Sequence, residues 1–316
     1  MNPPEETRLR NGLQRPAWGL GLLVALAFVP GAAPAQTGPL KPKVPPGRDP
    51  GGVAVAIIGA GADYRRPEIA ARIARDGEGE IIAWDVIDDD ARPLEAAPVA
   101  GRRVPPHAGT VMAQLLLAEA KAARLIPVRI PDANPLALGG ALAFAGQTPA
   151  RIAVLLVASD PSPQAQSWQL FIETARRWRR LLLIAPAGHH GGDADTQSAA
   201  PAGTGLDNLI VVTAADGQGR IADGASWGAT KVDIAIPPGP EEVPAGIDAG
   251  RAAALENGAA IRLAALAARL AALEPDLDGP ALKARVLAQA KPLPAAPFRR
   301  TRLGWIENPG SVQMSR

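Results

Sequence analysis

The sequence predicts a three-layer α/β/α fold whose central sheet is mostly parallel. Two observations lead to this fold class. Short apolar runs, typical of strands buried on both faces, recur along the chain, and segments with helical spacing separate them. The chain also has 316 residues, 47% of them apolar, which is enough for one sizeable core. No stretch in the middle of the chain has the composition of a linker between domains.

The predicted elements alternate as such a sheet requires. Helices are expected at 67–75, 110–123, 136–145 and 166–180, and an Ala/Leu-rich helix at 258–273 lacks a wide polar face, so we expect it in the centre of the domain. A last helix, 279–290, has Pro280 in its first turn, where proline fits well. The buried strands are expected at 53–58, 80–86, 125–130, 152–157, 181–185 and 209–214.

Residues 1–35 have the composition of a secretory signal peptide. Three arginines precede the apolar run Trp18–Val29, and Ala33-Pro34-Ala35 follows it. We therefore expect cleavage after Ala35 and a periplasmic or secreted protein. The apolar run is short and is followed by proline and glycine, which favours a cleaved signal over the alternative, a retained membrane anchor. The chain has no cysteine, so neither a disulfide nor a thiolate site is available.

The rest of the chain divides into three parts by composition. Residues 36–50 are polar and proline-rich and are expected to form an extended linker, 51–290 the folded domain, and 291–316 a C-terminal tail at the surface. The 33 Lys and Arg residues nearly balance the 31 Asp and Glu residues, which argues against a nucleic-acid-binding protein. The local basic cluster is interpreted as a solvated helix face and consists of Arg176, Arg177, Arg179 and Arg180.

The first predicted strand carries a family resemblance. It ends in Ile57-Ile58-Gly59-Ala60-Gly61-Ala62-Asp63, and Pro67-Glu68-Ile69 follows. This segment resembles the first catalytic motif of the subtilisin-like serine peptidases, in which Val-Ile-Asp-Ser/Thr-Gly-Val/Ile-Asp precedes His-Pro-Asp-Leu. In this register Gly59 stands at the position of the catalytic aspartate.

Three further segments follow the same family pattern. Residues 84–90 and 107–113 are similar to the acidic stretch that leads into His-Gly-Thr-His-Val-Ala-Gly, which places His107 at the catalytic histidine. Residues 185–191 resemble the Ala-Ala-Gly-Asn-x-Gly turn, and His189 replaces the asparagine that supplies an oxyanion donor. Residues 209–216 and 225–237 resemble the segments that follow this turn in the family.

The nucleophile motif of the family, Gly-Thr-Ser-Met/Phe-Ala, falls on residues 255–259. Asn257 then stands where the family has its serine. The chain between Thr230 and Thr301 contains no Ser, Thr or Cys, so no register of this motif places a hydroxyl or thiol nucleophile there. In subtilisin itself, loss of the nucleophile alone lowers turnover by roughly a millionfold.

The resemblance therefore implies a subtilisin-like fold without the family's peptidase chemistry. A triad needs an aspartate to orient the histidine and a hydroxyl to attack the substrate, and this chain has neither at the matching positions, Gly59 and Asn257. We interpret the protein as an inactive peptidase homologue that serves as an exported peptide- or protein-binding module. Binding of an extended peptide by strand addition depends on backbone groups and does not need the triad. The alternative is a divergent active serine-type endopeptidase, and neither reading calls for a cofactor.

Two other interpretations of the acids and histidines are less favoured. In the first, the orienting carboxylate of the triad is relocated to Asp63, Asp85 or Asp88. Aspartates in such segments more often form hydrogen bonds to the backbone of a turn or loop. His107 and His189 would face one cleft and would supply two ligands for zinc, but no third ligand has suitable spacing, so we expect no metal site.

A dinucleotide-binding fold is the remaining alternative. Gly59 and Gly61 end the first strand, and Asp85 ends the next, as in a Rossmann fold. However, Tyr64 occupies the position of the third glycine, and Pro67 interrupts the helix turn that must approach the pyrophosphate. The downstream family motifs also have no explanation in this fold.

Overall fold

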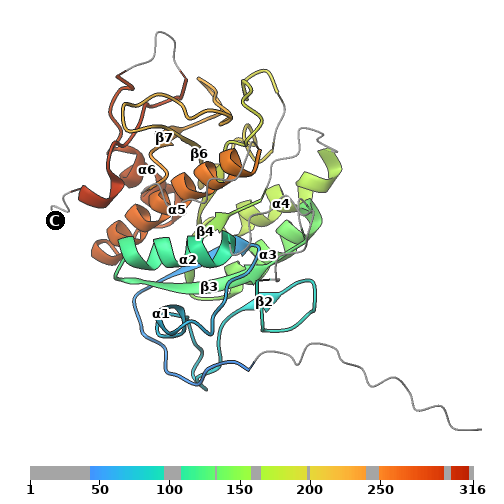
Figure 1. The fold of residues 1–316 in the computed structure, drawn as a ribbon. Helices are drawn as coiled ribbons and strands as arrows, with labels where there is room; N and C mark the ends of the chain where they lie inside the picture. Colours follow the sequence, from blue (N-terminus) through green and yellow to red (C-terminus); the bar gives the residue numbers. More distant parts are fainter. Residues whose placement is uncertain are drawn as a thin grey trace, which may run out of the picture. The chain divides into compact units, whose positions relative to one another are not determined.

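The computed structural model describes residues 43–312 apart from 96–107, 132–133, 158–164, 198–199, 240–248 and 295–299. The described residues contain a seven-stranded sheet in the order β2-β3-β1-β4-β5-β6-β7, and all neighbouring strands are parallel (Figure 1). This confirms the predicted parallel sheet. Its strands are β1 (Val53–Gly59), β2 (Trp84–Asp85), β3 (Ala123–Arg129), β4 (Ala150–Leu155), β5 (Leu182–Pro186), β6 (Leu209–Ala214) and β7 (Ile234–Ile236).

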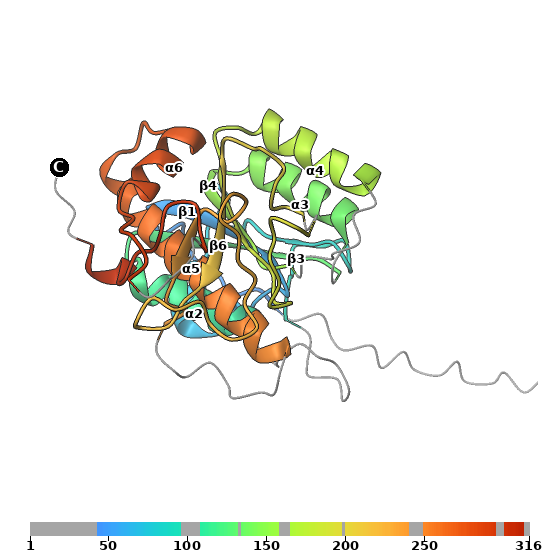
Figure 2. The same ribbon diagram turned by 90° about the horizontal axis from the view of Figure 1, so that it is seen from above.

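Helices cover both faces of this sheet. Figure 2 shows α3 and α4 on one side and α2 and α5 on the other, which confirms the three-layer arrangement. The helix α6 joins the core on the α5 side. The helices are α1 (Pro67–Ala70), α2 (Ala108–Glu119), α3 (Pro135–Gln147), α4 (Ala165–Arg177), α5 (Ala249–Leu273), α6 (Gly279–Leu287) and the short 3-10 helix η1 (Pro309–Ser311).

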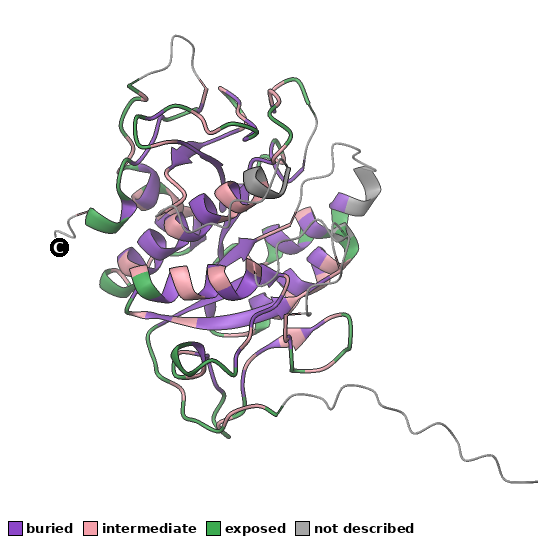
Figure 3. Ribbon diagram, in the orientation of Figure 1, coloured by how far each residue is buried: buried purple, intermediate pink, exposed green. Residues whose placement is uncertain are grey.

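The side chains of β1 show how the two cores arise. All seven residues of this strand are buried, and successive side chains point to opposite faces. Val55 and Ile57 join the core that contains α2 and α5, whereas Ala56 and Ile58 join the core of α3 and α4. The buried strands between helices are visible in Figure 3. A strand whose side chains alternate between two cores must be apolar on both faces, and β1 supplies such a continuous apolar run.

Three elements differ from the sequence prediction. The strand expected at 80–86 is reduced to β2, because Ile81 forms an antiparallel bridge with Arg75 and Asp85 forms one with Asp90. The helix expected at 67–75 is only four residues long. The central helix α5 begins at Ala249, well before the expected start at 258. In addition, the strand β7 was not expected from the sequence.

The chain on either side of residues 51–290 also contacts the domain. Trp305 and Ile306 are buried, and Trp305 bridges to Ala235 of β7. The packed part of the domain thus extends beyond residue 290, the boundary that the sequence predicts. At the other end, the Pro45 carbonyl accepts a 2.7 Å hydrogen bond from Arg75. The predicted signal peptide, 1–35, lies outside the described residues.

The basic cluster at the end of α4 includes both structural and exposed arginines. Arg180 donates to three backbone carbonyls at the end of α3 and the start of β4, and Arg179 pairs with Asp207 at 2.7 Å. Arg176 and Arg177 are exposed in the last turn of α4, as expected of a solvated face.

Within the part of the chain that the structure describes, no helix combines the length and the apolar composition of a membrane span.

Candidate functional site

The candidate site is built around the turn that follows β5. The Gly188 N–H donates a 2.6 Å hydrogen bond to Oε2 of Glu256, and the Ser226 N–H lies 3.2 Å from Oε1. Gly188 has φ 117°, a conformation that favours glycine. One carboxyl group of α5 therefore joins the turn after β5 to the loop that contains Ser226.

This carboxyl group is almost completely inaccessible. Glu256 is 1% exposed, and burial raises the pKa of its carboxyl well above its ordinary value. The Thr213 hydroxyl lies 3.3 Å from Oε1 and 2.6 Å from the Ser226 carbonyl oxygen, to which it donates. Its oxygen can then accept a hydrogen bond from the protonated carboxyl of Glu256. The surroundings of Glu256 thus suit a neutral carboxylic acid.

Two histidines follow Gly188 in the turn. His189 is half-buried and His190 is exposed, and their ring centroids are 4.6 Å apart. The backbone N–H of His190 lies 3.4 Å from Oγ of Ser226. Burial, and secondarily the neighbouring His190, lower the pKa of His189. At neutral pH its imidazole is therefore uncharged and carries one N–H donor.

Gly59, at the position of the family aspartate, is the last residue of β1 and is buried. In the sheet it lies opposite Arg129 of β3. A Cβ atom on Gly59 would lie 3.0 Å from the carbonyl oxygen and 3.1 Å from the Cβ of Leu156, the residue after β4. A side chain at this position requires Leu156 to shift, so the packing around the strand end is adapted to glycine.

The segment after β1 packs against the start of α2. The Gly61 carbonyl leaves no room for a side chain on Gly109, and the Asp63 N–H donates a 2.9 Å hydrogen bond to the Thr110 hydroxyl. Glu95 caps the helix by accepting from the N–H groups of Gly109 and Thr110 at 2.9 and 3.0 Å. The first two motifs are thus adjacent, as the resemblance implies. His107, which precedes α2, lies outside the described residues.

Asn257, at the position of the family serine, lies inside α5 rather than at its start. It is half-buried and is eight residues beyond Ala249. The expected start of this helix at Gly258 is therefore wrong. Gly258 is needed for close packing, because a Cβ atom there would lie 2.6 Å from the Pro238 carbonyl oxygen. The helix contains no Ser, Thr or Cys.

The acids considered as a relocated triad member have structural contacts instead. Asp63 pairs with Arg65 at 2.7 Å. Asp85 is fully buried, and its Oδ2 accepts a 2.8 Å hydrogen bond from Arg129, which also pairs with Asp88 at 3.1 Å. The other oxygen of Asp85 accepts from the backbone of the following turn. Asp85 thus bonds Arg129, and this contact argues against Asp85 as the ribose-binding acid of a dinucleotide site.

No role was predicted for Glu256, although the composition of its helix indicates that this residue is unusual. It is the only acidic residue in the 25-residue helix α5, whose sequence is dominated by Ala and Leu. An isolated acid in such a helix either faces solvent or is buried with specific partners. Here it replaces the residue before the family serine and closes the turn that holds His189.

Among the described residues, the site offers hydrogen-bond donors and an imidazole, and its two hydroxyl groups, those of Thr213 and Ser226, are buried. His189 and Asn257 each follow one partner of the Gly188–Glu256 contact, so this contact brings them to the same region. The residues that the resemblance assigns to the aspartate and the serine are present at the predicted strand end and helix. Gly59 has no side chain, and Asn257 carries an amide rather than a hydroxyl.

Comparisons with known proteins identify the fold. No family model matches the chain, and no curated protein is significantly similar to it. Solved structures do match. A cold-adapted subtilisin-like serine proteinase has 16% identity and a TM-score of 0.58, with 85% of this chain and 93% of that chain covered.

Two further structures agree. A protease from Pseudoalteromonas arctica has 16% identity and a TM-score of 0.62, with coverage of 83% and 89%. The nisin leader peptidase from Lactococcus lactis has 13% identity and a TM-score of 0.56, with coverage of 82% and 86%. These values, together with the strand order and the helix layers described above, lead to one conclusion: the chain has the subtilisin-like serine protease fold.

Proposed function

We propose that this protein is a catalytically inactive peptidase homologue that binds an extended peptide or a protein partner outside the cytoplasm. One observation is the main support for the proposed loss of catalysis. The helix that would present the nucleophile contains no hydroxyl or thiol, and at the nucleophile position it carries Asn257 inside the helix rather than at its start. The adjacent Glu256 is occupied by the Gly188 N–H, so it is not available to replace the serine as an exposed nucleophile.

The binding role is supported by a network of backbone hydrogen bonds beside the candidate site. The turn after β5 is joined to the 224–227 loop by three backbone hydrogen bonds, Gly191 N–H to Gly224, Ser226 N–H to Gly188 and Trp227 N–H to Gly192, each 2.8–3.0 Å long. Such a frame keeps backbone groups in fixed positions, which is what recognition of an extended peptide requires.

The similar structures support a peptide as the ligand. One is named as a leader peptidase and another as a lanthipeptide protease, so the same fold acts on peptides in those proteins. The proposed location outside the cytoplasm rests on the signal-like composition of residues 1–35.

Casein hydrolysis by the mature protein from Gln36 and by its His107→Ala variant tests this proposal. We expect no hydrolysis by either protein and equal binding of any peptide ligand. Hydrolysis that the His107→Ala substitution abolishes would identify a divergent active serine-type endopeptidase instead, because the retained histidine would then act as a general base.

A further inference from the structure

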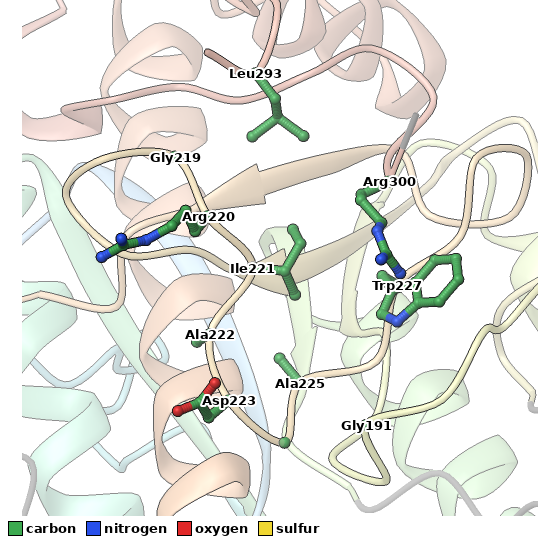
Figure 4. Close-up of a pocket in the computed structure, with 11 residues that line it drawn as sticks. Gly191, Gly219, Arg220, Ile221, Ala222, Asp223, Ala225, Trp227, Leu293 and Arg300 are labelled. Atoms are coloured by element: carbon green, nitrogen blue, oxygen red, sulfur yellow. The ribbon is translucent and has the colours of Figure 1, made fainter. Parts of the chain in front are cut away.

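A small cavity lies beside the turn after β5 and is lined mostly by residues of the 219–227 loop. Its volume is about 310 Å³, within the range of roughly 300–1,000 Å³ that small-ligand pockets occupy. Figure 4 shows Ile221 of the 219–225 loop between Arg220 and the Trp227 ring, with Leu293 above it. The lining therefore combines an apolar part, Ile221, Ala222, Ala225 and Leu293, with a few charged side chains.

The guanidinium of Arg300 is held at one end of this cavity. Its Cζ lies 3.7 Å from the centroid of the Trp227 ring. The backbone of Arg300 is fixed as well, because its carbonyl accepts a 2.9 Å hydrogen bond from Gly228 and the next residue, Thr301, is buried. Stacking occupies the face of a guanidinium and leaves its N–H groups at the edge free to donate.

The charges around the cavity leave Arg300 as its anion-binding group. The other lining cation, Arg220, is neutralised by a 2.7 Å ion pair with Asp216. Within the described part of the chain, Arg300 forms no such ion pair. The acidic lining residue, Asp223, is exposed and lies well apart from Arg300 and Trp227 (Figure 4).

We propose that this cavity binds the C-terminal carboxylate of a peptide whose last side chain is apolar. The Arg300 guanidinium donates to both carboxylate oxygens, a geometry that arginine matches closely. The apolar side chain lies against Ile221 and Leu293. The proposal rests on the proposed function in that its ligand is a peptide, and it adds which end of the peptide this protein recognises. Gly191 lines the cavity, so the bound terminus lies next to the turn that carries His189 and His190.

Titration calorimetry with three ligands tests this assignment. The ligands are N-acetyl-alanyl-leucine, its C-terminal amide, and 4-methylpentanoate, which has the same carboxylate and side chain without a peptide unit. We expect the peptide acid to bind about 10- to 100-fold more tightly than the amide, since a hydrogen-bonded charge pair is lost. The free acid should bind more weakly than the peptide acid.

Protein variants test the residues. Arg300→Gln should abolish the preference for the acid over the amide, and Arg300→Lys should restore part of it. Arg176→Gln, which removes an equal charge from the exposed end of α4, should leave binding unchanged. Intrinsic fluorescence and thermal unfolding verify that each variant is folded.

Three results would overturn the proposal: equal binding of the acid and the amide, no binding of the acid by the folded wild-type protein, or binding of 4-methylpentanoate as tight as that of the peptide acid. None of these binding results bears on peptidase activity, so failure of this proposal is separate from failure of the proposed function. Casein cleavage would overturn the proposed function whatever the calorimetry shows.

Discussion

The backbone N–H of Gly188 donates a 2.6 Å hydrogen bond to Oε2 of Glu256, across 68 residues of sequence. Gly188 immediately precedes His189, and Glu256 immediately precedes Asn257. The contact therefore joins the two segments that the resemblance assigns to the oxyanion donor and the serine of a subtilisin-like peptidase. In this chain a buried acid holds the two segments together, and the following residues do not supply the family's catalytic side chains.

Removal of this carboxyl should destabilise the domain. Glu256→Ala leaves the buried Gly188 N–H without its partner and creates a cavity, so we expect a loss of about 2–4 kcal/mol in the free energy of unfolding. Glu256→Gln should cost less, about 1–2 kcal/mol. Its carbonyl accepts from Gly188 and its NH₂ group donates to Thr213, but that NH₂ group also faces the Ser226 N–H, which keeps its hydrogen bond to the Gly188 carbonyl. Urea denaturation measures both. Equal losses in the two variants would contradict this assignment of the hydrogen bonds.

The same residue predicts a pH dependence of stability. Burial raises the pKa of Glu256 in the folded chain above its value in the unfolded chain. Between these two values only the unfolded chain releases the proton, so a rise in pH favours unfolding. Below both values the residue contributes no such penalty.

Glutamine cannot ionise, so the stability of Glu256→Gln relative to wild type should increase as the pH rises above 4.5, the ordinary pKa of a glutamate. The increase should be up to ~1.4 kcal/mol per pH unit within the window between the two pKa values. Denaturation curves at several pH values measure this difference. A difference that stays constant with pH would show that Glu256 has an ordinary pKa in the folded chain.

Restoring the family residues should not restore activity. Asn257→Ser places the hydroxyl within α5 rather than at its start, and Gly59→Asp forces a side chain against Leu156, whose carbonyl oxygen would be 3.0 Å from the new Cβ. We expect the double variant to be less stable than wild type by about 1–3 kcal/mol and to remain unlabelled by a fluorophosphonate probe. Labelling of the introduced serine would mean that the triad geometry is intact.

The ion pair at the end of β2 should matter more than its exposed neighbour. Asp85 is fully buried and bonds both Arg129 and the following turn, so Asp85→Ala should cost about 3–5 kcal/mol. Asp88 also pairs with Arg129, but its side chain is 60% exposed, so Asp88→Ala is the matched control and should cost less than about 1 kcal/mol. Equal effects on thermal stability would contradict the structural role of Asp85.

The sequence predicted the layers better than the ends of the elements. Apolar runs such as Val53–Gly59 specify buried strands because both faces of a parallel sheet are covered. The three-residue strand β7 is too short to give a recognisable pattern. The early start of α5 was missed because Asn257-Gly258 has the composition of a turn, whereas Gly258 is there to let the helix approach Pro238.

The candidate site was predictable in position but not in its contacts. The order of the motifs places Gly59 at a strand end and His189 in the turn after β5, where the structure has them. The partner of Glu256 was not predictable, because the Gly188–Glu256 contact joins residues that are distant in sequence. The pairing of Asp85 with Arg129 likewise depends on the register of two strands, which composition alone does not specify.

Fluorophosphonate labelling of the mature wild-type protein from Gln36, measured by intact mass with a casein digest alongside, tests the central claim most directly. We expect a folded protein with unchanged mass and intact casein, because α5 carries no hydroxyl at the position of the family nucleophile. A mass increase on one serine together with casein cleavage would contradict the account and would place the active serine elsewhere in the chain.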